Sequence, residues 1–418
     1  MEGDKMTFKV LTKEEYDSFL KTSPMNNFLQ SPKMDEIALS KKQKVHYVGI
    51  TKDDKVIAGA RILESNSHFG YKYFYSPRGL VLDYSNKELL NFFTKELKKY
   101  LKKHKGYVLE MDPLVVHKTR DIDGNVVEGG INNENIVRTL KVLGYKHKGF
   151  TTGFDMSKQM RWVFVLDLKG KSEEQVFGEL KQNAKRLITK CEKNGIEIHE
   201  ASYDELKDYK KILEATGARK KFNDKSLEYY QMMYKAFSDD NEIKFLIARL
   251  NVKEYLEKLN TNTTDIIKEI TRLSQNLNAK NEALISQLNQ SLEKIKSEIV
   301  EAEEIMKKAG EVIDLSAAMF MTYGDEVIYV FGGNIDEYMH FNAQYLIQWE
   351  MIKYGIKNGF GRYNFFGITG IFDKSDPEYG VYDFKKRFNG YVEEYIGEFA
   401  LPISYYYKID KLIHKVKK

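Results

Sequence analysis

Five basic residues recur at helical spacing within a short segment and could bind a polyanion. A spacing of roughly four residues places most of these charges along one side of a helix. Such a face binds phosphates without reading a base sequence. A face that only keeps a helix soluble has the same pattern, so both interpretations stay open. The five residues are Lys181, Lys185, Arg186, Lys190 and Lys193.

Residue types that support nucleophilic or metal chemistry are scarce. The chain has one cysteine, Cys191, among charged helix neighbours, and none of its eight histidines forms an HExxH pair. We therefore expect no catalytic thiol and no metal site. A single cysteine also excludes a disulfide framework and suits a reducing compartment. The first residues are unlike a signal peptide, and no apolar run is long enough to span a membrane, so we expect a cytoplasmic protein.

The bulk composition predicts two ordered domains with local basic surfaces. The 418 residues are 42% hydrophobic, which is enough to bury more than one core. The net charge of +5 comes from 66 basic and 61 acidic residues. A polyanion site must therefore be a patch on an otherwise balanced surface.

Residues 252–310 differ in character from the rest of the chain and predict a helical arm. Aromatic residues and glycine nearly vanish there, and apolar residues recur alternately three and four apart. The phase slips near residues 278–281, which predicts a turn between two antiparallel helices of a coiled-coil hairpin. A single helix would separate the flanking strands by roughly 80 Å, whereas a hairpin returns the chain to its start.

Without the arm, the sequence has the pattern of a weak internal duplication. Each half runs strand, strand, strand, helix, strand. This order is the layout of GNAT-like acyltransferases, and two copies predict a tandem α+β fold. The pyrophosphate loop of acyl-CoA enzymes is missing, so acetyl-CoA is not the expected donor.

The duplication divides the chain into four segments. We assign residues 1–150 to a first GNAT-like subdomain, and residues 151–251 with 311–400 to a second. Residues 252–310 form the arm, and 401–418 a basic C-terminal tail.

Several motifs, in this order around a helical insertion, resemble the Fem-type (FemABX) peptidyltransferases, closest to the FemA and FemB members. The resemblance covers nearly the whole chain. It implies transfer of glycine, or of serine or alanine, from aminoacyl-tRNA to the stem-peptide or bridge amine of a peptidoglycan precursor, with no cofactor. The motifs are Tyr73-Phe74-Tyr75-Ser76-Pro77-Arg78-Gly79 with Asp83-Tyr84 after it, the basic helix ending Lys193-Asn194-Gly195, Gln348-Trp349-Glu350-Met351-Ile352, Arg362-Tyr363-Asn364-Phe365-Phe366-Gly367 and Tyr379-Gly380-Val381-Tyr382-Asp383-Phe384-Lys385-Lys386.

The resemblance also implies site residues. Arg219 is similar to the family arginine that contacts the acceptor diphosphate, and Lys385 to the lysine near the reacting carbonyl. Asp112 is similar to the carboxylate near the acceptor, where it could hold or deprotonate the attacking amine. The other expected substrate contacts are Tyr75, Arg78 and Tyr363.

The partners remain open between several alternatives. The acceptor is lipid-linked or UDP-linked, and Glu36 stands where some relatives carry a lysine for the nucleotide diphosphate. The basic tail could contact the inner face of the membrane. The arm could grip tRNA, or join a homodimer or a related Fem-type enzyme. The main rival function is a non-catalytic wall-precursor-binding or immunity-type protein on the same fold.

Overall fold

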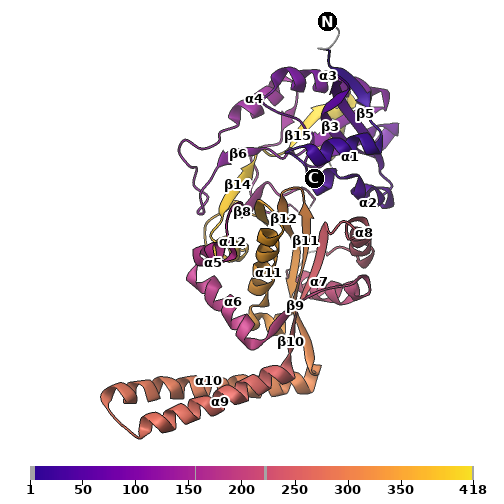
Figure 1. Ribbon diagram of the computed structural model, residues 1–418. Coiled ribbons are helices and arrows are strands. Elements are labelled where there is room, and N and C mark those ends of the chain that lie inside the picture. The colour runs from indigo at the N-terminus through magenta and orange to yellow at the C-terminus, as the bar shows by residue number, and fades with distance from the viewer. Residues whose placement is uncertain (1–4, 156, 221–223, 417–418) are drawn as a thin grey trace.

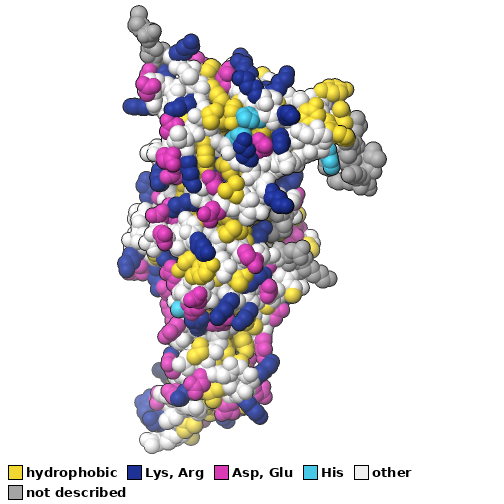
Figure 2. All heavy atoms as spheres, turned by 90° about the vertical axis from the view of Figure 1, so that its right-hand side faces the viewer, with side chains coloured by type: hydrophobic (Ala, Val, Ile, Leu, Met, Phe, Trp, Pro, Cys, Tyr) yellow, Lys and Arg dark blue, Asp and Glu magenta, His cyan; other side chains and the backbone are white. Residues whose placement is uncertain are grey.

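The computed structural model describes residues 5–155, 157–220 and 224–416, and its overall form is elongated. Two mixed β-sheets lie one above the other in Figure 1, and a pair of long helices projects from the far end of the second sheet. Basic and acidic side chains are interspersed over the face shown in Figure 2. This mixture fits the nearly balanced charge of the chain.

The first sheet has seven strands in the order β1-β2-β3-β4-β5-β15-β7. Strands β2 to β4 form an antiparallel meander, and β4 and β5 are parallel. The strands are β1 (Thr7–Val10), β2 (Lys44–Lys52), β3 (Lys55–Asn66), β4 (Lys72–Ser76), β5 (Gly106–Met111), β7 (Lys146–His147) and β15 (Phe399–Pro402).

Helix α3 connects the parallel strands β4 and β5, because parallel neighbours need a crossover connection. Its apolar residues recur every three or four positions, so Leu90, Phe93 and Leu97 are buried against the sheet. The helices of this half are α1 (Lys13–Thr22), α2 (Asp35–Ser40), α3 (Lys87–Lys103), α4 (Glu134–Val142) and the C-terminal α13 (Tyr406–Val416).

The second sheet has eight strands in the order β6-β14-β8-β13-β12-β11-β10-β9. Here β10 to β12 form the meander, and β12 and β13 are parallel. The strands are β6 (Val116–Thr119), β8 (Trp162–Asp167), β9 (Ile196–Glu200), β10 (Ile243–Asn251), β11 (Val312–Tyr323), β12 (Glu326–Asn334), β13 (Arg362–Ile368) and β14 (Tyr391–Tyr395).

Helices cover both faces of the second sheet. The almost entirely buried α11 joins β12 to β13, in the same position as α3 in the first half. The helices are α5 (Glu173–Glu179), α6 (Gln182–Asn194), α7 (Leu206–Lys220), α8 (Leu227–Phe237), α11 (Ala343–Lys357) and α12 (Tyr379–Lys386).

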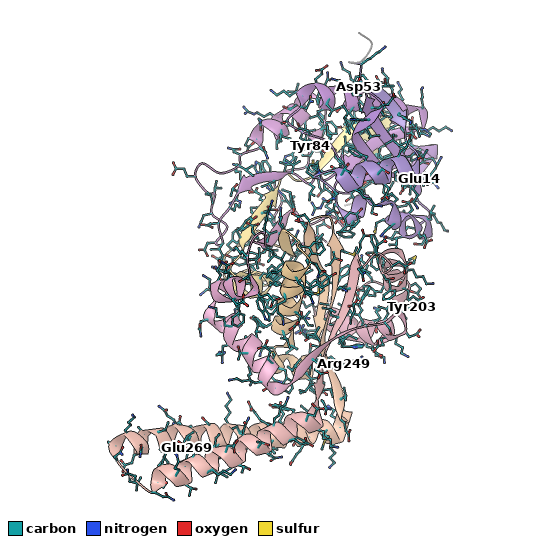
Figure 3. The ribbon with its side chains drawn as sticks, viewed as in Figure 1. Glu14, Asp53, Tyr84, Tyr203, Arg249 and Glu269 are labelled. Carbon is teal, nitrogen blue, oxygen red and sulfur yellow. The ribbon has the colours of Figure 1, made fainter. Side chains whose placement is uncertain are left out.

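The predicted duplication is visible in the strand order. Strands β2, β3, β4 and β5 correspond to β10, β11, β12 and β13, with α3 and α11 as equivalent crossovers. The β2–β3 connection is a tight turn at Asp53 and Asp54, both at positive φ. The equivalent connection of the second half holds the whole arm. Figure 3 labels Asp53 in that turn, Arg249 near the base of the arm and Glu269 within it.

The two halves exchange strands across the expected domain boundaries. Strand β6, within residues 1–150, pairs with β14 in the second sheet, and β15, assigned to residues 311–400 and 401–418, pairs with β5 in the first. Helix α13 packs by Tyr406 against Tyr71 at a ring-centroid distance of 4.3 Å. The residues called a basic tail are therefore part of the first half up to 416, and Lys417 and Lys418 lie outside the described residues.

The arm is a pair of helices, α9 (Val252–Ser274) and α10 (Ala279–Ala309), that run antiparallel in Figure 1. The helices are joined by residues 275–278, slightly before the turn expected at residues 278–281, and the Asn278 side chain caps α10. Near the base, Leu256, Leu259 and Ala302 are buried, whereas Leu277 at the tip is 62% exposed. In the described part of the chain, no helix is long and apolar enough to cross a membrane.

Candidate active site

Besides the arm, the two halves differ in how far their parallel strands stay paired. In the first half, β4 and β5 pair to the end of β4, as far as Ser76 and Met111. In the second half, β12 and β13 pair only over residues 326–328 and 362–364. Beyond these residues the strands part, and a pocket of about 310 Å³ opens between them, lined by residues 329–332 of β12 and 365–367 of β13.

A bulge in β13 shapes this opening. The register against β8 shifts between Asn364 and Gly367, and Phe366 takes a positive φ of 62°. The Asn364 side chain holds the bulge by accepting a hydrogen bond of 2.8 Å from the Phe366 amide. Bulges re-aim the groups that follow them. Here the Gly367 carbonyl is placed at the pocket wall.

Lys385 reaches this wall from α12. Its side chain is buried, and Nζ donates a 2.5 Å hydrogen bond to the Gly367 carbonyl. No described carboxylate forms an ion pair with it. Burial, with a smaller contribution from the positive charge of Lys220, lowers the pKa of Lys385 to about 7. The ammonium is therefore poised between its charged and neutral forms near neutral pH.

A second pocket of about 410 Å³ continues from the first. We call the two together the transfer groove. Arg219, in the last turn of α7, lines the second pocket and forms an ion pair of 3.1 Å with Asp336. Lys220 pairs with Glu378 at 2.9 Å across the groove. The residues common to both pockets are Lys220, Tyr329, Gly332, Glu378, Val381 and Lys385.

Asp112 lies in a separate cluster at the end of β5. It accepts hydrogen bonds of 2.6 Å from the Tyr75 hydroxyl and from the backbone amide of Arg78. Burial raises the pKa of Asp112 to about 6, against the charge of Arg78 and the donated hydrogen bonds, which lower it. The structure thus brings Asp112, Tyr75 and Arg78 together. It does not bring them into the lining of the transfer groove.

Two expected substrate contacts have structural roles. Arg78 is only 3% exposed, and its guanidinium donates to the Met160 carbonyl and lies 4.7 Å from the Tyr395 ring, so it joins the two halves. Tyr363 is fully buried and donates to Gln348 at 2.7 Å. Both polar groups are already used inside the protein, and the expected contact of these two residues with substrate stays a prediction.

Comparison with known proteins decides the family. The FemAB family matches residues 11–415 of the sequence. The chain belongs to the FemAB family. It is 34% identical over 422 residues to aminoacyltransferase FemA of Staphylococcus epidermidis, covering 99% of this chain and all of that protein. It is 33% identical to aminoacyltransferase FemA of Staphylococcus aureus strain N315, with 96% of each chain covered.

A solved structure agrees with this assignment. The crystal structure of FemX superimposes on this FemAB protein with a TM-score of 0.77 and 26% identity, over 97% of this chain and 99% of that one. The chain is therefore an aminoacyltransferase, and the predicted Fem-type resemblance is confirmed.

The basic segment of this FemAB protein is helix α6, and most of its predicted residues line one groove. This groove, of about 630 Å³, lies between α6 and the base of the arm and is called the basic groove below. It contains Lys185, Arg186, Lys190 and Lys193. Lys181 stands outside this lining, at the N-cap of α6.

The basic groove also includes Lys258 of α9, which lies far from the basic segment in the sequence. The start of α9 lies beside α6, which places Lys258 in the same groove as the other four. The charge is partly balanced, since Lys190 pairs with Glu298 of α10 at 3.2 Å.

Cys191 is buried under the same helix rather than solvated. Its thiol donates to the Phe341 carbonyl at 3.3 Å, and burial raises its pKa to about 12. A thiol in this state is a poor nucleophile.

Proposed function

We propose that this FemAB aminoacyltransferase builds the interpeptide bridge of peptidoglycan. It transfers glycine, or serine or alanine, from a charged tRNA to the stem-peptide or growing bridge amine of a wall precursor. The observation that carries the proposal is the buried Lys385 ammonium, which lies without a carboxylate partner among described residues in the groove where β12 and β13 part.

The reaction needs alignment and charge stabilisation more than a nucleophile. The acceptor amine attacks the ester carbonyl, the bond to the ribose oxygen breaks, and the amine proton passes to the departing tRNA hydroxyl. Negative charge develops on the carbonyl oxygen, and a nearby Lys385 ammonium would stabilise it. No cofactor enters this balance. Asp112 lies outside the lining of the transfer groove. We keep it as the proposed carboxylate near the acceptor amine, and its pKa of about 6 leaves it mostly ionised at neutral pH.

The basic groove is the proposed contact for the tRNA donor. Its lysines and arginine lie between two helical surfaces, a geometry that fits a phosphate backbone better than a single exposed helix does. Arg219, at the far pocket of the transfer groove, is the proposed contact for the acceptor diphosphate because its planar guanidinium suits phosphate oxygens. The exposed part of the arm is the proposed contact for tRNA, for a second copy of this chain, or for a related Fem-type enzyme.

A lipid-linked acceptor would require the enzyme to work at the inner face of the membrane. Phe69 is 82% exposed and Tyr405 73% exposed at the edge of the first half, beside α13. Lys408 and Lys411 lie above the rings of Tyr405 and Tyr407. Exposed aromatic rings next to lysines suit an anionic lipid surface. This surface supports a cytoplasmic enzyme that contacts the membrane peripherally.

The test is a transfer reaction with defined substrates. The protein is incubated with glycyl-, seryl- or alanyl-tRNA and with lipid-linked or UDP-linked precursor, and the product is weighed by mass spectrometry. We expect a mass increase of one amino acid from one of these tRNAs. Binding of the precursor without transfer from any charged tRNA would instead support the non-catalytic wall-precursor-binding function.

A further inference from the structure

Three potential metal ligands meet on the first half, outside the transfer groove. In the β2–β3 pair, His46 is opposite Ile62 and Lys44 is opposite Glu64, so His46 and Glu64 are diagonal neighbours on one face. His104 caps the C-terminal end of α3, which packs over this part of the sheet. One ligand atom from each of His46, Glu64 and His104 lies within 4.8 Å of the other two.

The three ligand atoms of this cluster span a slightly larger distance than those around a bound zinc ion. His46 Nε2 is 2.9 Å from Glu64 Oε2, and the rings of His46 and His104 are 5.1 Å apart. Ligand atoms around a tetrahedral Zn²⁺ ion lie roughly 3.3 Å apart, given bonds of about 2.0–2.2 Å. A small rotation of the half-buried His104 ring would complete this geometry.

The surroundings of His46 provide the support that metal-binding histidines require. Its Nδ1 atom is 2.8 Å from the Tyr100 hydroxyl, which leaves Nε2 for a ligand. Metal-bound imidazoles usually make such a hydrogen bond through the other ring nitrogen, because it holds the ring in position. Tyr100 precedes His104 by one helical turn, so the last turn of α3 provides both a ligand and this support.

A hydrogen-bonded cluster without metal is the competing explanation. His46 is satisfied by Glu64 and Tyr100, and Lys72 lies 3.5 Å from Glu64 Oε1. Lys72 also donates to Asn66 at 2.5 Å, so it keeps a partner if a cation takes the carboxylate. His104 is not explained by this network, because its contacts to His46 and Tyr100 are ring contacts.

We propose that His46, Glu64 and His104 bind one divalent transition-metal cation, with Zn²⁺ as the fitting ion. Two imidazoles and one carboxylate form a donor set typical of zinc, with a fourth position for water. His46 is buried, whereas Glu64 and His104 are partly exposed, so a cation could reach the cluster from the side of these two residues. Because the cluster lies in the first half, the metal would fasten α3 to β2 and β3 and take no part in transfer.

The experiment is a metal titration of the full-length protein after chelation and removal of the chelator. Zn²⁺ binding is measured by calorimetry, and Co²⁺ is used as a spectroscopic probe of tetrahedral coordination. We expect one equivalent to bind and to raise the thermal midpoint. Glu64→Gln and His104→Gln should abolish both effects. Tyr100→Phe should keep the site but weaken affinity about 10- to 100-fold, as loss of a supporting hydrogen bond does.

A matched control is His340→Gln, which removes an exposed histidine that pairs with Glu301 in the second half. It should bind Zn²⁺ like the wild-type protein. Circular dichroism of each metal-free variant confirms that it is folded. The proposal is overturned if the wild-type protein binds no Zn²⁺ or Co²⁺, or if folded His104→Gln and Glu64→Gln bind as tightly as His340→Gln.

Discussion

Replacing Lys385 by methionine should make the enzyme slower and more stable at once. Methionine keeps the length of the side chain but has no charge. Burial depresses the pKa of Lys385 from 10.5 to about 7, so at pH 7 the unfolded chain is fully protonated there and the native chain only half. This difference costs the native state about 4 kcal/mol at pH 7. Loss of the hydrogen bond to the Gly367 carbonyl destabilises the variant by about 1 kcal/mol. The net gain in unfolding free energy is roughly 3 kcal/mol.

The pH dependence separates this effect from ordinary repacking. Between about pH 7 and pH 10.5 the unfolded state binds more protons at Lys385 than the native state, so this lysine makes wild-type stability rise with pH. Lys385→Met should lose that rise. The measurement is chemical denaturation of both proteins at several pH values in this window. If the unfolding free energy of the two proteins changes with pH at the same rate, the pKa of Lys385 is not depressed in the native state.

Activity should move in the opposite direction. If the ammonium stabilises the oxyanion, Lys385→Met lowers kcat by about 10²- to 10³-fold, the usual cost of removing one such donor. In the wild-type protein, the Lys385 contribution falls as pH rises through about 7, because the ammonium is lost. The conservative Lys385→Arg keeps its charge and should remove this falling limb. An unchanged kcat in Lys385→Met, with the stability gain present, would refute the catalytic role alone.

Three further results are expected. Replacing Lys185 and Arg186 by glutamate should weaken tRNA binding and reduce the slope of log affinity against log salt concentration by about 0.7–0.9 per lost phosphate contact. The control Lys169→Glu, in an exposed turn, should change neither quantity. Filter binding at several salt concentrations measures both. Burial raises the pKa of Asp112 to about 6, so this carboxyl makes the wild-type protein less stable as the pH rises from about 4 to about 6. Asp112→Asn should remove that fall, which thermal unfolding across this window measures. Deleting residues 270–291 and closing the shortened arm with a turn should leave the fold intact by circular dichroism, because the arm residues that pack on the second half, Leu256, Leu259, Ile295, Ile299 and Ala302, are kept. The deletion should reduce transfer if the distal arm holds tRNA.

The sequence predicts the parts of this protein that depend on local periodicity. The arm was predictable because its apolar spacing is helical and its flanks are strands that have to meet. The transfer groove was not, because it depends on where the pairing of β12 and β13 ends, which is a matter of register between strands separated by a helix. A motif identifies Lys385, but only the fold shows that its ammonium is buried beside the Gly367 carbonyl.

Residues of the family motifs can lie inside the protein rather than on the groove. Tyr363 and Arg78 stand in motifs shared with the family, yet both are buried and bonded within the protein. A conspicuous motif does not distinguish a residue that touches substrate from one that holds the site in place. Lys258 and His104 show the converse. Each joins residues distant in sequence, so spacing alone carries no signal for either.

The duplicated fold explains why the groove occurs in the second half only. In both halves a meander leads through a crossover helix to a parallel strand. The two parallel strands can stay hydrogen-bonded to their ends or separate before them. In the first half the strands stay paired, and at the closed end Asp112 accepts hydrogen bonds from the Tyr75 hydroxyl and the Arg78 amide. In the second half a bulge at Phe366 parts them, and Lys385 occupies the wall of the opening. The closed half supports the open one, because the guanidinium of Arg78 crosses to Met160 and Met160 packs against Gly367. The Asp112 cluster can thus affect transfer by holding Gly367, and through it the Lys385 ammonium, in place.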